Sequence, residues 1–196
     1  MLTRLFLRML NREAASPKRG AARILESLQL TEGMTVADIG SGGGYFALAF
    51  ARKVGTRGRV YAVDSQSKYL DFVKRQAAKA GLTNIEILVA ERNGVALPEA
   101  TLDLIFARNV FHHLADPEAY FRSLRRALKP AGTVAVIEHA PARGVGFVRL
   151  FRHFTSPERI RTAMEAAGYR LSASFDFLPV QTFTVWSRAD GGHAAP

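Results

Sequence analysis

Apolar and polar residues alternate along the chain in blocks that predict strands separated by helices. Short apolar runs recur at intervals long enough for a helix, and they read "TVADIG", "RVYAVD", "IEILVA", "LDLIFA" and "TVAVIEH". Such runs are typical of strands buried on both faces in a parallel sheet. Two further runs, "YRLSASFDF" and "TFTVWS", lie too close together for a crossover and must pair antiparallel. The pattern predicts an α/β fold with a doubly wound sheet of five parallel-type strands and a C-terminal antiparallel hairpin, seven strands in all.

Cap residues and glycines indicate where the helices begin and end. Asp or Ser followed by Pro is typical of a helix start, and Gly of a helix end. The predicted helices run from Ser16-Pro17 to Leu28, from Tyr45 onward, from Lys68 to Ala80, from Asp116-Pro117 to Leu128, and from Ser156-Pro157 to Gly168. A turn, "KPAG", should follow Leu128. We expect one domain over residues 1–187 and a disordered tail over residues 188–196.

The first residues of the chain predict an amphipathic basic helix. One face carries apolar residues at helical spacing, and another face carries the three basic residues Arg4, Arg8 and Arg12. The apolar set is Leu2, Leu5, Phe6, Met9 and Leu10. Two interpretations stay open: residues 1–28 form a helical lid over the substrate, together with a second lid at residues 140–156, or residues 1–12 contact an anionic membrane surface.

Composition excludes several classes of chemistry. The 196 residues include no cysteine, which rules out disulfides, a thiol nucleophile and cysteine-ligated metals, and we expect no metal site. We expect no signal peptide at the opening residues, because arginines interrupt the apolar stretch. We therefore expect a cytoplasmic protein that could lie peripherally on the inner membrane face. The net charge of +10 suits an anionic partner, yet basic residues are spread along the chain without a run of five.

The stretch "VADIGSGGGYF" breaks an apolar strand with glycines and continues as a helix. Gly40, Gly42 and Gly44 allow a tight turn and close approach of a ligand to the backbone, with helix N–H groups directed at it. Asp64 ends the next strand, at the spacing where an acidic side chain accepts the hydroxyls of an adenosine ribose. Strand, turn, helix, strand and acid together indicate a nucleoside ligand.

Asp38 narrows the choice of nucleoside. A carboxylate two residues before the first glycine would repel a pyrophosphate, and Tyr45 stands where a dinucleotide loop needs glycine. A ligand with an ammonium and a sulfonium group, such as S-adenosylmethionine, would instead be attracted. The alternative is that Asp38 only caps the loop by accepting hydrogen bonds from backbone N–H groups. This role is compatible with attraction of a cationic ligand.

These motifs resemble those of class I S-adenosylmethionine-dependent methyltransferases, of the branch similar to the UbiE and type 11 enzymes. "VADIGSGGGYF" is similar to the family's D-x-G-x-G-x-G motif, and "VYAVD" follows as the second motif. The segments "ERNGVALPEATLDLIFARNVFHHL" and "LRRALKPAGTVAVIEH" resemble the family's later motifs, so the resemblance runs from about Leu28 to Trp186. It implies a Rossmann-like fold and S-adenosylmethionine as cofactor.

The resemblance also implies which residues contact the cofactor. The loop residues would hold the methionine portion, Asp64 the ribose and Ser65 the adenine, with Asn93 or Glu91 bonding the adenine amino group. Residues after the fourth strand would lie beside the sulfonium. The full set is Asp38, Gly40, Ser41, Gly42, Gly44, Tyr45, Asp64, Ser65, Glu91, Asn93, Ala107, Arg108 and Asn109.

Methyl transfer needs proximity and orientation, and a base only if the acceptor carries a proton. His112, His113 and Glu138 follow the fourth and fifth strands, and His112 is the favoured base. These histidines could equally cap or pack. We expect a methyltransferase acting on a small or amphiphilic molecule, with no nucleic-acid partner. Lipid methylation at a membrane surface and a non-catalytic S-adenosylmethionine-binding module remain alternatives.

Overall fold

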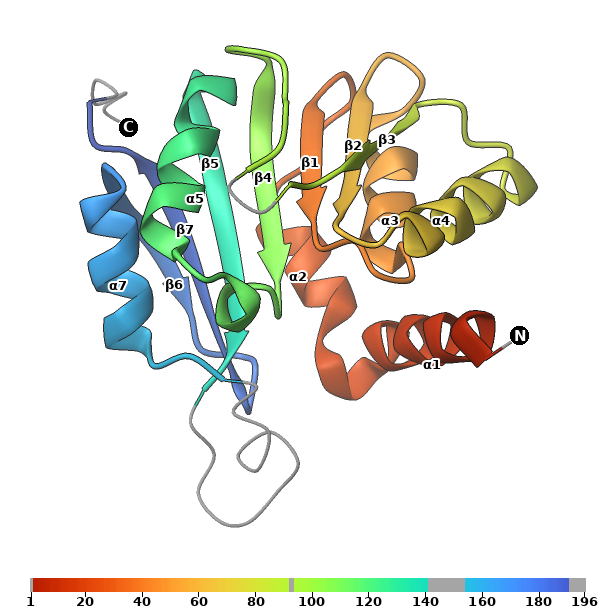
Figure 1. Ribbon diagram of the computed structural model, residues 1–196, viewed down its shortest axis with the longest axis horizontal. Helices are drawn as coiled ribbons and strands as arrows, with labels where there is room; N and C mark the ends of the chain where they lie inside the picture. Colours follow the sequence, from red (N-terminus) through yellow and green to blue (C-terminus); the bar gives the residue numbers. More distant parts are fainter. Residues whose placement is uncertain (1, 92–93, 141–153, 191–196) are drawn as a thin grey trace. The chain divides into compact units, whose positions relative to one another are not determined.

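The computed structural model describes residues 2–91, 94–140 and 154–190, and these group into two compact units. The first unit is Met1–Ala96 and the second is Leu97–Pro196. The second of the two lids expected from the sequence, at residues 140–156, falls almost entirely outside the described residues. Each unit contains β-strands with helices packed against them (Figure 1).

The first unit is built on three parallel strands. They are β1 (Thr35–Ile39), β2 (Arg59–Asp64) and β3 (Ile85–Val89), in the order β3-β2-β1. Helices α3 (Tyr45–Val54) and α4 (Ser67–Lys79) pack against these strands and against each other. Strands β1 and β2 are buried over nearly their whole length, as expected for strands covered by helices. The parallel orientation of these three strands is as predicted.

The N-terminal part of the first unit differs from the prediction in one place. Helix α1 (Leu2–Ala15) is followed by a 3-10 turn, η1 (Pro17–Arg19), and a short helix, α2 (Ala21–Ser27). The prediction of one helix from Ser16-Pro17 to Leu28 was wrong. Gly20 adopts a left-handed conformation, with φ of 65°, and its N–H bonds the carbonyl oxygen of Pro17, which closes the 3-10 turn before α2 begins.

The second unit contains four strands of mixed orientation. Its strands are β4 (Leu102–Arg108), β5 (Leu128–His139), β6 (Tyr169–Phe175) and β7 (Gln181–Arg188), in the order β4-β5-β7-β6. Strands β4 and β5 are parallel, while β7 runs antiparallel to both of its neighbours. The predicted antiparallel hairpin is thus confirmed, and the described strands of the two units number seven, as expected.

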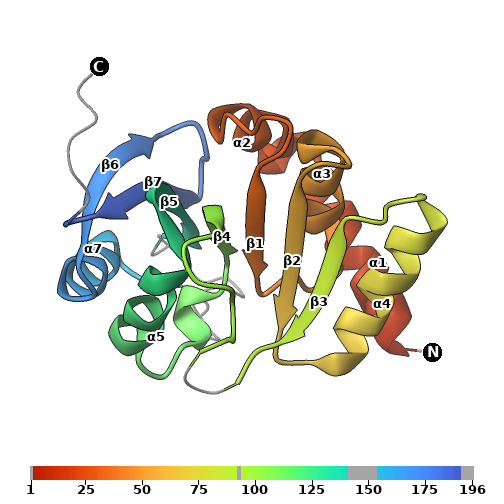
Figure 2. The ribbon, with the colours of Figure 1, turned by 90° about the horizontal axis from the view of Figure 1, so that it is seen from above.

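Helices α5 (Pro117–Leu124) and α7 (Pro157–Ala166) cover one face of these four strands (Figure 2). Both begin with the predicted cap. An Asp116 side-chain oxygen accepts a hydrogen bond from the Ala119 N–H at 2.9 Å, and the Ser156 hydroxyl accepts one from the Arg159 N–H at 3.2 Å.

The segment after α5 departs from the prediction. The helix ends at Leu124 and a 3-10 turn, η3 (Arg125–Ala127), follows, while "KPAG" lies inside β5 rather than in a separate turn. Pairing with β4 shifts in register at this point, and a Cβ atom on Gly132 would lie only 2.6 Å from the Leu102 carbonyl oxygen. Glycine therefore permits the close backbone approach that a bulged strand requires here.

The C-terminal end of the described chain is ordered further than expected. Strand β7 continues through Arg188, and the Asp190 carboxylate pairs with Arg188 and with Arg125 at 3.1 and 2.8 Å. Residues 188–190 therefore belong to the second unit rather than to a disordered tail. The remaining tail residues, 191–196, lie outside the described residues. None of the described helices is long and apolar enough to cross a membrane.

Candidate functional site

The loop between β1 and α3 has the geometry that its glycines predict. Gly40, Gly42 and Gly44 have φ values of 69°, 52° and 81°, all in the left-handed region that favours glycine. The Ser41 hydroxyl donates its one proton to two backbone oxygens, those of Asp38 at 2.8 Å and Val63 at 3.2 Å. These contacts hold the loop against the ends of β1 and β2. The turn that leads into α3 therefore has a fixed position relative to both strands.

Asp38 is buried at the end of β1, with 4% of its surface exposed. Burial raises the pKa of its carboxyl to about 8, and a hydrogen bond from the Ala47 backbone opposes that shift. The expected capping role of Asp38 is consistent with this bond to the first turn of α3. Its Oδ2 atom, however, has no hydrogen-bond partner among the described residues. An unpartnered buried carboxylate oxygen is costly, and a cationic donor such as an ammonium group would satisfy it.

Asp64 lies at the end of β2 and holds the glycine loop from the other side. Its Oδ2 atom accepts a hydrogen bond from the Gly42 N–H at 3.0 Å, and its Oδ1 atom accepts one from the Gln66 N–H at 2.9 Å. A carboxylate has about four acceptor positions, so each oxygen keeps capacity for a further donor such as a ribose hydroxyl. The structure therefore adds to Asp64 a loop-fixing role that the sequence did not indicate.

The other predicted cofactor residues of the first unit differ in their exposure. Tyr45 is half-buried, and its ring meets the Phe46 ring edge to face, with centroids 5.1 Å apart. Ser65 and Glu91 are exposed, and Glu91 pairs with Gly94 through two backbone hydrogen bonds. Asn93 lies outside the described residues. Their contacts with the adenine stay predictions.

Asn11 of α1 is a residue that the sequence analysis missed. Its Nδ2 atom donates a hydrogen bond to the Gly43 carbonyl oxygen at 2.7 Å. A Cβ atom on Gly43 would lie 2.1 Å from Asn11 Oδ1 and 2.7 Å from the Leu7 carbonyl oxygen, so only glycine allows α1 to pack this closely on the loop. The sequence signal that could have indicated Asn11 is its position on the same helix face as Leu7, which is fully buried.

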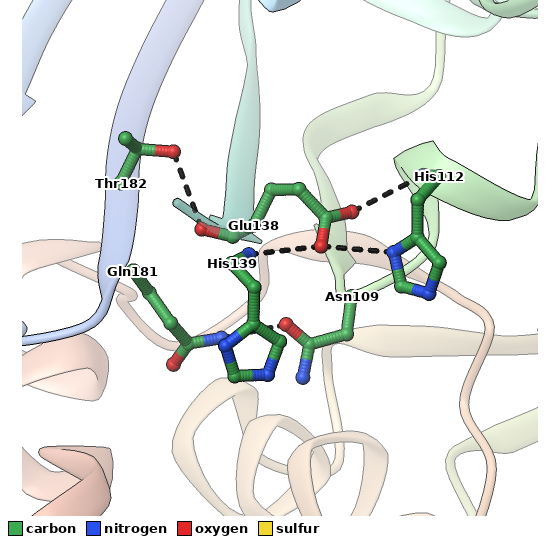
Figure 3. Close-up of polar contacts among 6 residues, drawn as sticks. All are labelled: Asn109, His112, Glu138, His139, Gln181 and Thr182. Carbon is green, nitrogen blue, oxygen red and sulfur yellow. Dashed lines mark hydrogen bonds and ion pairs between the residues drawn. The ribbon is translucent and has the colours of Figure 1, made fainter. Parts of the chain in front are cut away.

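In the second unit, His112 and Glu138 form a buried pair (Figure 3). The His112 Nδ1 atom lies 2.9 Å from Glu138 Oε1, and the exposed fractions of the two side chains are 6% and 0%. The Glu138 carboxylate also accepts hydrogen bonds from the backbone N–H groups of His112 and His139, at 3.3 and 2.9 Å. A carboxylate on Nδ1 favours the tautomer whose Nε2 atom is an acceptor, which is the form that a general base needs.

His113 is placed differently from its neighbour. It is exposed, and its ring lies against the His112 ring with centroids 4.0 Å apart and planes tilted by 46°. Of the predicted catalytic residues, the structure joins His112 and Glu138 by a hydrogen bond, whereas His113 meets His112 through ring contact.

Polar residues at the end of β4 are joined to the start of β7. Asn109 has a φ of 56°, a left-handed conformation that asparagine tolerates, and its Oδ1 atom accepts a hydrogen bond from Gln181 Nε2 at 2.6 Å (Figure 3). An Arg108 nitrogen donates to Gln181 Oε1 at 3.0 Å, and Ala107 is buried. Gln181, which is 6% exposed, was missed by the sequence analysis, although a glutamine opening an apolar strand could have indicated it.

The described residues contain no cluster of three or more His, Cys, Asp or Glu side chains that could hold a metal ion. The candidate site offers the glycine loop, Asp38 and Asp64 in the first unit, and His112 with Glu138 in the second. The orphaned oxygen of Asp38 fits a ligand with a cationic amine better than one with a phosphate.

Comparison with known proteins agrees with a ligand that carries a cationic amine. The family described as "Methyltransferase domain" matches residues 30–168, which span parts of both units. The chain is 32% identical over 107 residues to the ubiquinone/menaquinone biosynthesis C-methyltransferase UbiE of an Enterobacter species, covering 54% of this chain and 43% of that protein. It is also 32% identical over 116 residues to a protein-L-isoaspartate O-methyltransferase of Methanococcoides burtonii, covering 59% and 54%. The chain thus spans about half the length of these curated relatives.

A solved structure shows the same fold over almost the whole chain. It is a SAM-dependent methyltransferase from Aquifex aeolicus, with 28% identity and a TM-score of 0.80, covering 91% of this chain and 96% of that one. The predicted Rossmann-like fold is confirmed, and so is the UbiE-like resemblance. The chain belongs to the methyltransferase domain family, in the class that uses S-adenosylmethionine as its cofactor.

Proposed function

We propose that this chain binds S-adenosylmethionine at the glycine loop of its first unit and transfers a methyl group to a small or amphiphilic acceptor. When bound, the cofactor supplies an already activated methyl group on a sulfonium. The observation that carries the proposal is the Asp38 Oδ2 atom, which is buried beside a glycine turn and lacks a partner among the described residues. A cationic amine there satisfies the oxygen and favours the ionised carboxylate.

The remaining loop contacts support the same ligand. Asp64 accepts the ribose hydroxyls with the acceptor capacity that Gly42 and Gln66 leave unused. Gly40 and Gly42 present backbone without side chains, so the methionine portion can pass close to the loop. Tyr45, half-buried at the start of α3, covers that portion. Each of these residues binds or orients the cofactor. Methyl transfer depends mainly on such proximity and orientation.

His112 is the proposed general base for an acceptor that must lose a proton. Glu138 holds Nδ1 of the imidazole at 2.9 Å and fixes the ring, so Nε2 is directed away as the acceptor. The carboxylate is itself held by two backbone N–H groups, which makes it a rigid orienting group. We therefore assign Glu138 a positioning role and His112 the proton-accepting role, with Ala107, Arg108 and Asn109 as further residues toward the sulfonium.

The acceptor atom is not selected by the relatives, since one is named a C-methyltransferase and another an O-methyltransferase. One observation favours an amphiphilic acceptor over a purely polar one. Helix α1, which packs on the glycine loop through Asn11, exposes several large apolar side chains. Methylation of a lipid at a membrane surface is accordingly the second candidate function.

The test is transfer of labelled methyl groups from S-adenosylmethionine to extracts of polar metabolites and of lipids, analysed separately. The proposal expects a labelled product in one extract and a strongly reduced yield with His112→Ala. Label in the lipid extract would select the second candidate. Tight S-adenosylmethionine binding without label in either extract would contradict the proposed transfer and support the alternative of a non-catalytic binding module.

A further inference from the structure

Helix α1 has two apolar faces, whereas the sequence analysis expected one. The inner face carries Leu7, which is fully buried, and Leu10, whose side chain lies near Gly42. The outer face carries four large apolar side chains, and their exposed fractions are 85% for Leu2, 67% for Leu5, 42% for Phe6 and 54% for Met9. Helical spacing puts this outer set opposite Leu7, and Leu10, expected with it, belongs to the inner face instead.

The outer face is bordered by basic residues. Arg4, Arg8 and Arg12 are exposed and lie on one flank of it at a spacing of four residues. Towards α4, a hollow of about 390 Å³ opens beside the outer face, and it is lined by Leu2, Thr3, Phe6, Gln66, Lys68 and Tyr69. The Phe6 ring meets the Tyr69 ring here, with centroids 6.4 Å apart. The surface therefore combines apolar side chains with an arginine row and a lysine.

We propose that the outer face of α1 binds an anionic lipid bilayer, and that this binding strengthens cofactor binding through the contact of α1 with the glycine loop. The second part rests on the proposed function. In this arrangement Leu2, Leu5 and Met9 enter the acyl boundary, while the arginines meet the headgroups, as in helices that lie in a membrane interface.

Charge favours a bilayer over a second copy of the chain as the occupant of this face. A second copy carries the same arginine row and the same net charge of +10, so like charges oppose its approach to this face. An anionic bilayer is attracted to the same arginines and also accepts the apolar side chains between them. The chain's net charge of +10 favours approach to such a surface as well.

The link to the cofactor runs through the opposite face of the same helix. Asn11 bonds the Gly43 carbonyl oxygen at 2.7 Å, and the backbone of α1 at Leu7 lies so close to Gly43 that no Cβ atom fits between them. A bilayer that holds α1 in place also holds this side of the glycine loop. Because coupling between two binding events is reciprocal, the cofactor must strengthen bilayer binding by the same factor.

The docking part is tested first, without cofactor, by co-sedimentation of the full chain with two kinds of vesicle. One is phosphatidylcholine alone and the other an equal mixture of phosphatidylcholine and phosphatidylglycerol. We expect preferential binding to the anionic vesicles that weakens with added salt. Leu5→Gln with Met9→Gln should abolish it, and Arg4→Gln with Arg8→Gln should weaken it about 25-fold.

The matched control for this experiment is Val89→Gln, which alters another large apolar side chain of the first unit that is 55% exposed but lies outside α1. It should bind vesicles as the unchanged chain does. Equal binding to both vesicle types, or none, would overturn the docking proposal. Self-association that disappears with the Leu5→Gln and Met9→Gln changes would assign the face to a second copy and overturn it as well.

The linkage is then tested by titrating S-adenosylhomocysteine with and without the anionic vesicles. The unchanged chain should bind about fivefold more tightly with vesicles, while the Leu5→Gln and Met9→Gln variant should show one affinity in both conditions. Asn11→Ala should still bind vesicles but lose the fivefold gain. Vesicle binding with unchanged ligand affinity would overturn the linkage. Failure of the ligand to bind in either condition would refute the proposed function and the linkage that rests on it, leaving the docking result intact.

Discussion

His112 and Glu138 are 26 positions apart in the sequence, yet the imidazole Nδ1 atom and the carboxylate Oε1 atom lie 2.9 Å from each other. The carboxylate is fully buried and is held by the backbone N–H groups of His112 and His139. Three donors on one buried carboxylate fix the orientation of the ring. The pair therefore has the geometry of a proton acceptor with an orienting group.

We expect His112→Ala to lower the turnover of an acceptor that loses a proton by about 100-fold or more, because a general base contributes that much to such a step. The affinity for S-adenosylmethionine should not change. His113→Ala is the matched control, since it removes the exposed imidazole next to it. The measurement is single-turnover methyl transfer together with calorimetry, and equal losses for both variants would contradict the assignment.

Glu138→Ala should destabilise the protein, whether or not the pair is catalytic. The change leaves the part-buried N–H groups of His112 and His139 without their acceptor, at a cost of at most about 1–3 kcal/mol each. Glu138→Gln keeps an acceptor oxygen and should cost less. Chemical denaturation of the two variants measures the difference, and equal unfolding free energies would show that these hydrogen bonds are not needed for stability.

Asp38 should make both stability and ligand binding depend on pH. Burial raises the pKa of its carboxyl from 3.8 to about 8, so between these values the folded chain keeps a proton that the unfolded chain has lost. Stability without ligand therefore falls as the pH rises through this window, by up to about 1.4 kcal/mol per pH unit. Asp38→Asn should remove this dependence. Denaturation curves at several pH values measure it, and the same slope in both proteins would contradict the shift.

The affinity for a cationic amine should also depend on the ionisation of Asp38, but it should rise with pH where the stability falls. The amine favours ionised Asp38, so binding below pH 8 releases the proton, and affinity should rise by up to about tenfold per pH unit from pH ~6 to ~7.5. Calorimetry in buffers of different ionisation enthalpy counts the released protons. A binding reaction that releases none would show that Asp38 does not meet the amine.

Asp64→Ala should weaken S-adenosylmethionine binding at least tenfold, because it removes charge-assisted hydrogen bonds to the ribose, each contributing about 1.5–3 kcal/mol. It also frees the Gly42 N–H, so the loop itself should loosen. Asp71→Ala, at an exposed position of α4, removes the same charge from the same unit and should have little effect. Unchanged affinity in Asp64→Ala would place the ribose elsewhere.

Local sequence patterns predicted the parts of the fold and site that depend on neighbouring residues. The strand before the glycines, the positive φ at Gly40, Gly42 and Gly44, and the acid at the end of β2 all follow from short-range spacing. Cap pairs such as Asp116-Pro117 correctly placed the start of α5. In each case the chain itself supplies the constraint within a few residues.

Contacts between distant residues could not be predicted in this way. Asn11 meets Gly43 over 32 positions, and Gln181 meets Asn109 over 72, so no spacing rule connects them. The buried face of α1 could not be predicted for a related reason. The helix has apolar residues on two faces, and only tertiary packing decides that Leu7 is buried while Leu5 is exposed. Gly20 and Gly132 likewise set the end of a 3-10 turn and a close approach of two strands. Both effects depend on backbone geometry that composition does not reveal.

The glycine loop with Asp38 and Asp64 should bind S-adenosylmethionine and not a dinucleotide. The decisive experiment is calorimetric titration of the full chain with S-adenosylhomocysteine and, in parallel, with NAD. We expect saturable one-to-one binding of S-adenosylhomocysteine, weakened by Asp64→Ala, and no heat of binding with NAD. Saturable NAD binding with no signal from S-adenosylhomocysteine would contradict it.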